Sequence, residues 1–197
     1  MANKVFISFR FSDGNEIKEA LVNKFEKLDY IINKSENENR SEMSDETIQK
    51  YLYDKLKDTS LTVVLITPQA VEHNLDYLGN IDDWMYDEIR YSLEDRMGNR
   101  TNAMIMVYTE DAKDLVIADQ NTDVTVVSNF FNLARKNMMN VKSDKKLEPR
   151  HGLYNSLEDS YVSLVSYDLF LEDPKKYTDN AISKRDRKDD FNLVKSL

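Results

Sequence analysis

The sequence contains no cysteine, and its only two histidines are His73 and His151. The absence of cysteine excludes disulfide bonds and thiolate catalysis, and it removes the most common ligands of zinc. With only two histidines, few side chains are available to bind a metal ion or to serve as the base that activates a nucleophile. We therefore expect no metal site, and a function that depends on other side chains.

Glycine and proline are also scarce, with four and three copies among 197 residues, while 41% of the residues are hydrophobic and 32% are charged. This composition is typical of a folded domain rather than a disordered chain, and the length suits one domain with a substantial core. Basic residues number 27 against 36 acidic ones, which gives a net charge of -9. Because nucleic-acid binding requires a basic surface, we expect no nucleic-acid partner.

Long apolar runs are absent as well. No stretch is long enough for a signal peptide or a membrane span, and the first residues lead directly into the apolar segment 5–9. We therefore expect a cytoplasmic protein that does not bind membranes.

Short apolar segments typical of β-strands alternate with segments in which apolar residues recur at helical spacing. The expected strands are residues 5–9, 30–32, 61–66, 103–107 and 161–165. Helices are expected from the spacing at 17–28, 48–56 and 85–93, and near 126–139 and 174–187, with a polar loop at 34–44 and a basic loop at 142–150. The alternation predicts an α/β fold with a doubly wound parallel sheet of about five strands and flanking helices, as in flavodoxin-like proteins.

We expect one domain over residues 1–197. Residues 110–160 read as an irregular, insertion-like region, and residues 161–197 as the last strand and a C-terminal helix. The segment 61–66 is apolar on both faces, which favours the centre of the sheet.

In such sheets, ligands bind beyond the carboxyl ends of the strands. The segment 9–13 after the first strand and the helix that contains Trp84 and Glu88 are therefore expected to meet at this edge. Trp84 and Glu88 are four residues apart, so both project from one helix face. A flat ring beside a carboxylate suits a nucleotide, since the ring can stack on a base and the carboxylate can bind ribose hydroxyls or a developing positive charge.

The sequence resembles a known family at these places. Residues 5–13 (VFISFRFSD) resemble the opening strand and loop of TIR domains, and Trp84-x-x-x-Glu88 resembles their Trp–Glu helix motif. Residues 61–67 followed by 84–89 resemble the TIR-like domains of the ThsB type, from Thoeris anti-phage systems, and residues 161–168 resemble the C-terminal portion of that subgroup. The resemblance covers most of the chain and is weakest between residues 110 and 160.

The resemblance implies a TIR-like fold and cleavage of NAD, the substrate rather than a cofactor, at the bond between ribose and nicotinamide. It implies that Glu88 is the catalytic residue, whereas a glutamate on a helix is otherwise most simply a solvated residue. One carboxylate is chemically sufficient, because nicotinamide is already cationic in NAD and leaves as a neutral molecule without an acid. The resemblance also implies an ADP-ribose-derived signal, cyclic in our expectation, that acts on a separate effector protein.

The expected substrate-binding residues are Ser8, Phe9, Arg10, Asp13 and Trp84. Arg10 suits a phosphate or ribose oxygen, and no aspartate before it neutralises its charge; a surface ion pair is the alternative. Asp13 has the spacing of a helix cap, and that role is favoured over a ligand contact. Phe9 is expected to pack in the core rather than floor a pocket, and Trp84 to be either a core or lid residue or a stacking platform.

Other functions of this fold pattern fit less well. A phospho-receiver domain needs an aspartate after the third strand, where Thr67 stands, and an FMN carrier needs small residues where residues 9–11 are bulky. A non-catalytic TIR-like module that binds a nucleotide or a protein stays open as the alternative. Many TIR domains assemble through an apolar or aromatic loop after the second strand, whereas residues 34–44 are polar, so a homo-oligomer also stays open.

Overall fold

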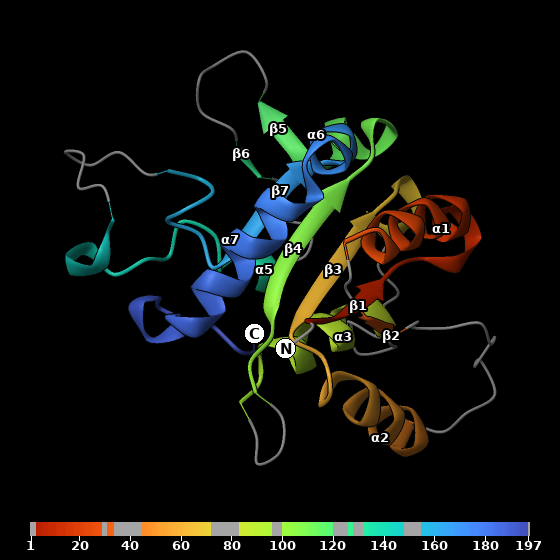
Figure 1. Ribbon diagram of the computed structural model, residues 1–197, viewed down its shortest axis with the longest axis horizontal. Helices are drawn as coiled ribbons and strands as arrows, with labels where there is room; N and C mark the ends of the chain where they lie inside the picture. Colours follow the sequence, from red (N-terminus) through yellow and green to blue (C-terminus); the bar gives the residue numbers. More distant parts are fainter. Residues whose placement is uncertain are drawn as a thin grey trace.

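The computed structural model describes residues 3–28, 31–33, 45–71, 83–95, 100–119, 126–127, 132–147 and 155–196. At its centre lies a five-stranded sheet in the order β2-β1-β3-β4-β7, in which all neighbours are parallel (Figure 1). The strands are β1 (Lys4–Ser8), β2 (Ile31–Asn33), β3 (Leu61–Ile66), β4 (Ala103–Tyr108) and β7 (Val162–Ser166). This is the order of a flavodoxin-like sheet, and the predicted α/β fold is confirmed.

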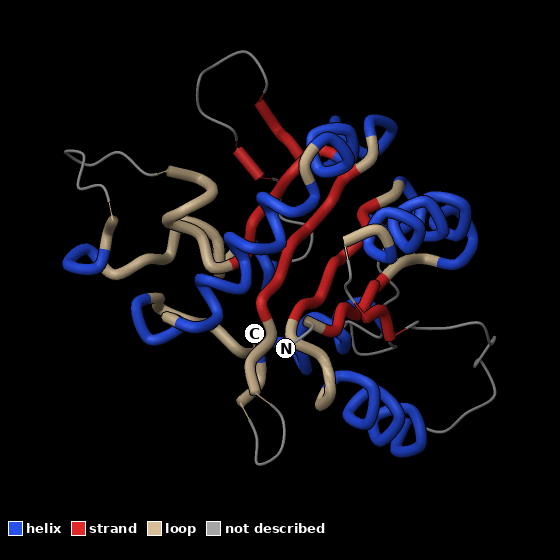
Figure 2. The backbone as a smooth tube through the Cα atoms, viewed as in Figure 1, coloured by secondary structure: helices blue, strands red, loops and turns tan. Residues whose placement is uncertain are grey.

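The helices cover both faces of the sheet. They are α1 (Phe11–Glu26), α2 (Asp45–Leu56), α3 (Trp84–Leu93), α4 (Lys113–Val116), α5 (Asn132–Arg135), α6 (Tyr167–Glu172) and α7 (Pro174–Asp186). Short 3-10 helices lie at η1 (Pro68–Val71), η2 (Glu110–Ala112), η3 (Ser143–Lys145) and η4 (Lys188–Asp190), and β5 (Ile117–Asp119) pairs with β6 (Val126–Val127) in a separate antiparallel ribbon. Helix α7 packs against β4, and Figure 2 shows it running alongside this strand. No helix in the described ranges is long and apolar enough to cross a membrane.

Strand β3 is buried on both faces, as its sequence predicts. Val63 and Leu65 pack in the cluster formed with α1, α6 and α7, whereas Val64 and Ile66 pack in the cluster formed with α3 and α5. The alternation of side chains along a strand places the two sets on opposite faces. β3 is therefore the shared wall of two hydrophobic cores.

Two helix boundaries differ from the sequence-based expectation. Helix α1 begins at Phe11, directly after the strand, and not near Asp13. Where a helix is expected near 126–139, the described residues form strand β6 at 126–127 and the four-residue helix α5, followed by a turn. Beyond α5, Asn137 exchanges hydrogen bonds with Val194 in the C-terminal segment, and Met139 has a φ of 50°. These contacts with a distant segment favour a turn where local periodicity indicates a helix.

The C-terminal helix is predicted correctly, but the short α6 before it is not. Ser166 accepts a hydrogen bond from the backbone N–H of Leu169 and so caps α6, while Asp173 caps α7 by accepting from the N–H of Lys176. His73, His151 and the polar loop 34–44 lie outside the described residues.

Candidate functional site

The segment after β1 is joined to the first turn of α3 by an ion pair. Nη2 of Arg10 lies 2.5 Å from Oδ2 of Asp83, whose side chain is fully buried. The other carboxylate oxygen of Asp83, Oδ1, accepts a hydrogen bond from the backbone N–H of Met85 at 3.0 Å and so caps α3. The two segments that we expected to meet at the carboxyl edge of the sheet do meet there. Arg10 thus forms an ion pair, the alternative left open for it, although the partner carboxylate is buried and comes from a position later in the chain.

Asp13 makes a second connection at the same edge. Its Oδ1 accepts a hydrogen bond from Oγ1 of Thr67 at 2.7 Å, and its Oδ2 accepts from the backbone N–H of Gln69 at 3.0 Å. The prediction that Asp13 caps the helix is wrong: Arg10 occupies the N-cap position, without a side-chain cap, and Asp13 lies in the first turn. Because α1 starts immediately after β1, the carboxylate of Asp13 reaches the segment that follows β3.

Phe9 packs in the core, as the sequence favours. Its side chain belongs to the cluster on the α1 face of the sheet. A Cβ at Gly14 would come within 3.2 Å of the ring, so α1 approaches Phe9 closely because this position has no side chain. The ammonium of Lys18 lies 5.1 Å from the ring centre. Phe11, the next aromatic residue, is 60% exposed. Phe11 is therefore better placed than Phe9 to contact a ligand, and it was not among the predicted residues.

Ser8 is the last residue of β1 and is fully buried. Within the described ranges, its Oγ has no hydrogen-bond partner. A buried hydroxyl without a partner costs free energy, so such groups are commonly satisfied by water or a ligand. Ser8 thus offers a donor and acceptor at the carboxyl end of the strand.

Trp84 begins α3 and is half-buried. Its ring packs against the hydrophobic cluster of Phe6, Leu52, Leu56 and Tyr91, which joins β1, α2 and α3. This contact is the packing role that the sequence left open for Trp84. It also fixes α3 against α2, which holds the first turn of α3 in place.

Glu88 is buried, with 4% of its surface exposed, so the alternative of a solvated helix residue is wrong. One turn later, Oγ of Ser92 lies 2.7 Å from Oγ1 of Thr62 on β3. Ser8 pairs in register with Val64, two residues further along β3. Because α3 runs from the carboxyl edge to the amino edge of the sheet, this register places Glu88 on the sheet-facing side of α3, near the level of Ser8.

Tyr108 is a further residue of this edge that sequence reasoning missed. It ends β4 and pairs in register with Ile66 and Ser166. Burial raises the pKa of its hydroxyl, so the group is a hydrogen-bond donor at neutral pH. The rule that ligands bind beyond the carboxyl ends of strands would have indicated Tyr108, since it closes an apolar run.

The arrangement is a carboxylate buried on the sheet-facing side of α3, a strand end near its level that carries a hydroxyl, and an arginine held by the aspartate that caps the same helix. Among the side chains that the structure describes, no cluster of three or more acidic residues or histidines is arranged to hold a metal ion. The site residues described above offer a carboxylate, a hydroxyl and a guanidinium.

Residues 6–114 match the family described as Thoeris protein ThsB, TIR-like domain. The match covers more than half of the chain and includes all six predicted site residues, from Ser8 to Glu88. It also includes strands β3 and β4 and the whole of α3, which bear the geometry described above. The chain therefore belongs to the ThsB family of TIR-like domains.

Proposed function

We propose that the protein cleaves NAD at the bond between ribose and nicotinamide, with Glu88 as the catalytic carboxylate. The observation that carries this proposal is the burial of Glu88 on the sheet-facing side of α3, near the level of the last residue of β1. Glu88 lies on the buried face of α3, one turn before Ser92, and buried ionisable groups are commonly found at functional sites. The family match over the same residues supports the assignment.

The reaction needs little from the protein. The bond between C1′ of the ribose and the nicotinamide nitrogen breaks, and both electrons go to the nitrogen, which becomes neutral. The ribose carbon becomes an oxocarbenium-like cation, which a nearby carboxylate stabilises, more strongly where water is excluded. A hydroxyl group or water then adds to C1′ and loses a proton, which Glu88 can accept.

The neighbouring residues have matching roles in this proposal. Arg10 binds the pyrophosphate or a ribose oxygen, and its bond to Asp83 holds the guanidinium at the edge of the sheet. The hydroxyl of Ser8 binds a ribose hydroxyl near C1′. Phe11, with its exposed ring, and Trp84, at the start of α3, form walls against the base.

We further propose that the product is an ADP-ribose-derived signal, in cyclic form, which acts on a separate effector protein. Cyclisation requires the cationic intermediate to meet a nucleophile of the same molecule before it meets water. Aromatic walls at the carboxyl edge favour this outcome, because they exclude water from the face of the ribose.

Mass spectrometry of NAD incubated with the purified protein tests the first proposal. We expect release of nicotinamide in amounts that exceed the protein many times over. NAD that stays intact in the presence of stoichiometric protein would favour the alternative, a TIR-like module that binds a nucleotide or a protein without turnover.

A filtrate experiment tests the second proposal. After the reaction, all protein is removed and the small-molecule fraction is added to a candidate effector encoded nearby. We expect a cyclic ADP-ribose isomer in the filtrate and activation of the effector. An inert filtrate that contains only nicotinamide and linear ADP-ribose would contradict signalling and would leave NAD depletion as the better account.

A further inference from the structure

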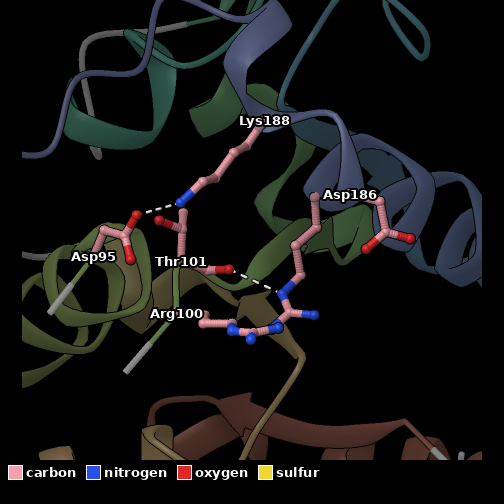
Figure 3. Close-up of a pocket in the computed structure, with 6 residues that line it drawn as sticks. Asp95, Arg100, Thr101, Asp186 and Lys188 are labelled. Atoms are coloured by element: carbon pink, nitrogen blue, oxygen red, sulfur yellow. Dashed lines mark hydrogen bonds and ion pairs between the residues drawn. The ribbon is translucent and has the colours of Figure 1, made fainter. Parts of the chain in front are cut away.

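A second site lies at the opposite edge of the sheet. A cavity of about 310 Å³ opens where the C-terminal ends of α3 and α7 meet the start of β4 (Figure 3). Its walls are formed by Asp95, Arg100, Thr101, Arg185, Asp186 and Lys188. Glu88 and Arg10 lie at the carboxyl edge of the same sheet, so this cavity is separate from the proposed NAD site.

The charges in the cavity are unevenly paired. Lys188 forms an ion pair with Asp95, so these two charges compensate each other. Nε of Arg185 donates a hydrogen bond to the backbone carbonyl of Thr101 at 2.9 Å. In Figure 3 the carboxylate of Asp186 points away from the guanidinium of Arg100. Within the part of the chain that the structure describes, neither Arg100 nor Arg185 forms an ion pair with a carboxylate.

Two guanidinium groups thus line one cavity in a protein whose net charge is -9. Their mutual repulsion is unfavourable unless an anion lies between them. Arginine donates paired hydrogen bonds that match the oxygens of phosphate, which makes it the preferred residue for such groups.

Thr101 supplies an independent indication of a ligand. The residue is 1% exposed, it lines the cavity, and its Oγ1 has no hydrogen-bond partner among the described residues. A buried hydroxyl of this kind costs stability unless something binds it. Thr101 belongs to the wall that also carries the two guanidinium groups, and the three residues together supply donors suited to one phosphate.

We propose that this cavity binds the phosphate group of a small anion. The volume lies at the lower end of the range for small-molecule sites, which suits free phosphate or a mononucleotide and not a whole dinucleotide. The phosphate is the shared chemistry of both ligands. The site goes beyond the proposed NAD cleavage and does not depend on it.

Calorimetric titration of the full chain with inorganic phosphate and, separately, with AMP tests the proposal at constant ionic strength. Arg100→Gln and Arg185→Gln are each expected to weaken binding by about tenfold or more, because each removes charge-assisted hydrogen bonds. Arg135→Gln is the matched control, since Arg135 is an exposed arginine on α5 that does not line the cavity. Arg10→Ala reports separately on phosphate bound at the carboxyl edge, where Arg10 is proposed to bind NAD.

Thr101→Val separates a binding role from a structural one. The variant removes a hydroxyl that has no hydrogen-bond partner in the described ranges, and it keeps the shape of the side chain. We expect weaker phosphate binding and an unchanged or higher melting temperature. Equal affinity for phosphate and AMP would identify free phosphate as the ligand, and tighter binding of AMP would identify a nucleotide.

Two results would overturn the proposal. One is the absence of heat and of any thermal shift when either ligand is added to the wild-type chain at millimolar concentration. The other is binding that Arg100→Gln, Arg185→Gln and Thr101→Val all leave unchanged, since the ligand would then lie elsewhere. Binding that is lost only in Arg10→Ala would assign the phosphate to the carboxyl edge and would also count against the proposal.

Discussion

Arg10 donates a hydrogen bond to the buried carboxylate of Asp83, and the same carboxylate caps helix α3 through the N–H of Met85. Arg10, two residues beyond the end of β1, is thereby fixed to the helix that carries Glu88. Because one carboxylate serves both contacts, the placement of Arg10 and the start of α3 depend on each other. A substitution at either position therefore affects structure and substrate binding together.

Arg10→Ala is expected to lower the free energy of unfolding by about 1–3 kcal/mol, because Asp83 stays buried and loses a charged donor. In an Asp83→Asn background the same change should cost less, since the amide carries no charge. Urea denaturation of the two single variants and the double variant measures the coupling, which we expect to reach at least about 0.5 kcal/mol. Strictly additive effects would mean that the pair contributes nothing to stability.

The role of Arg10 toward NAD is measured by kinetics. If Arg10 binds phosphate or ribose oxygens equally in the ground and transition states, Arg10→Ala raises KM more than it lowers kcat. Asp83→Asn serves as the comparison, because it weakens the same contact but keeps the guanidinium. An unchanged KM in Arg10→Ala would remove Arg10 from substrate binding.

Glu88→Gln is expected to lower kcat for NAD cleavage by about a hundredfold or more, as for the loss of a group that stabilises transition-state charge. Asp87→Asn is the matched control on the neighbouring residue, whose carboxylate is 39% exposed and pairs with Arg90. Because Glu88 is buried, its replacement also affects folding, so melting temperatures are measured for both variants. A Glu88→Gln protein that folds and retains full activity would exclude Glu88 from the mechanism.

Asp13→Ala removes the acceptor of two hydrogen bonds that join α1 to the segment after β3. We expect a loss of about 1–3 kcal/mol in the free energy of unfolding, measured by urea denaturation. Glu16→Ala, on the exposed side of the same helix, is the control and should change stability by about 0.5 kcal/mol or less. If Asp13 and Glu16 formed a capping box, both substitutions would destabilise the protein. Equal losses in the free energy of unfolding would therefore support the sequence-based prediction that Asp13 caps α1.

Lys184 predicts a pH dependence of stability. It is fully buried on α7, where Nζ donates to the carbonyl of Leu157 and to Oγ of Ser163. Its pKa is lowered from 10.5 to about 7, mainly by burial; Glu158 opposes this shift and Arg187 contributes to it. Between these pH values the unfolded chain binds more protons than the folded chain, so stability rises with pH from about 7 to about 10.5.

Urea denaturation at several pH values from 7 to 9 measures this rise, whose slope is at most about 1.4 kcal/mol per pH unit for one group. Lys184→Met should flatten the curve, whereas Lys176→Met, on an exposed lysine of the same helix, should leave it unchanged. A slope that persists in Lys184→Met would assign the pH dependence to another group.

Local features of the sequence determined the order of strands and helices. The apolar run 61–66 specifies a strand buried on both faces, and the periodic segment 85–93 indicates α3, which Asp83 caps in the structure. Both depend on neighbours along the chain, through side-chain periodicity and capping. For the same reason Trp84 and Glu88 could be placed on one helix from their spacing alone.

Only the tertiary structure decided which partners these residues meet. Arg10 and Asp83 are 73 positions apart, and Asp13 and Thr67 are 54 apart, so no local pattern specifies either contact. The two arginines of the cavity at the amino edge come together only because α7 packs near the start of β4. The physical reason is that helix and strand formation depends mainly on adjacent residues, whereas burial and ion pairing depend on how the sheet and helices pack. This packing sets the exposure of Glu88 and gives Arg10 its partner carboxylate.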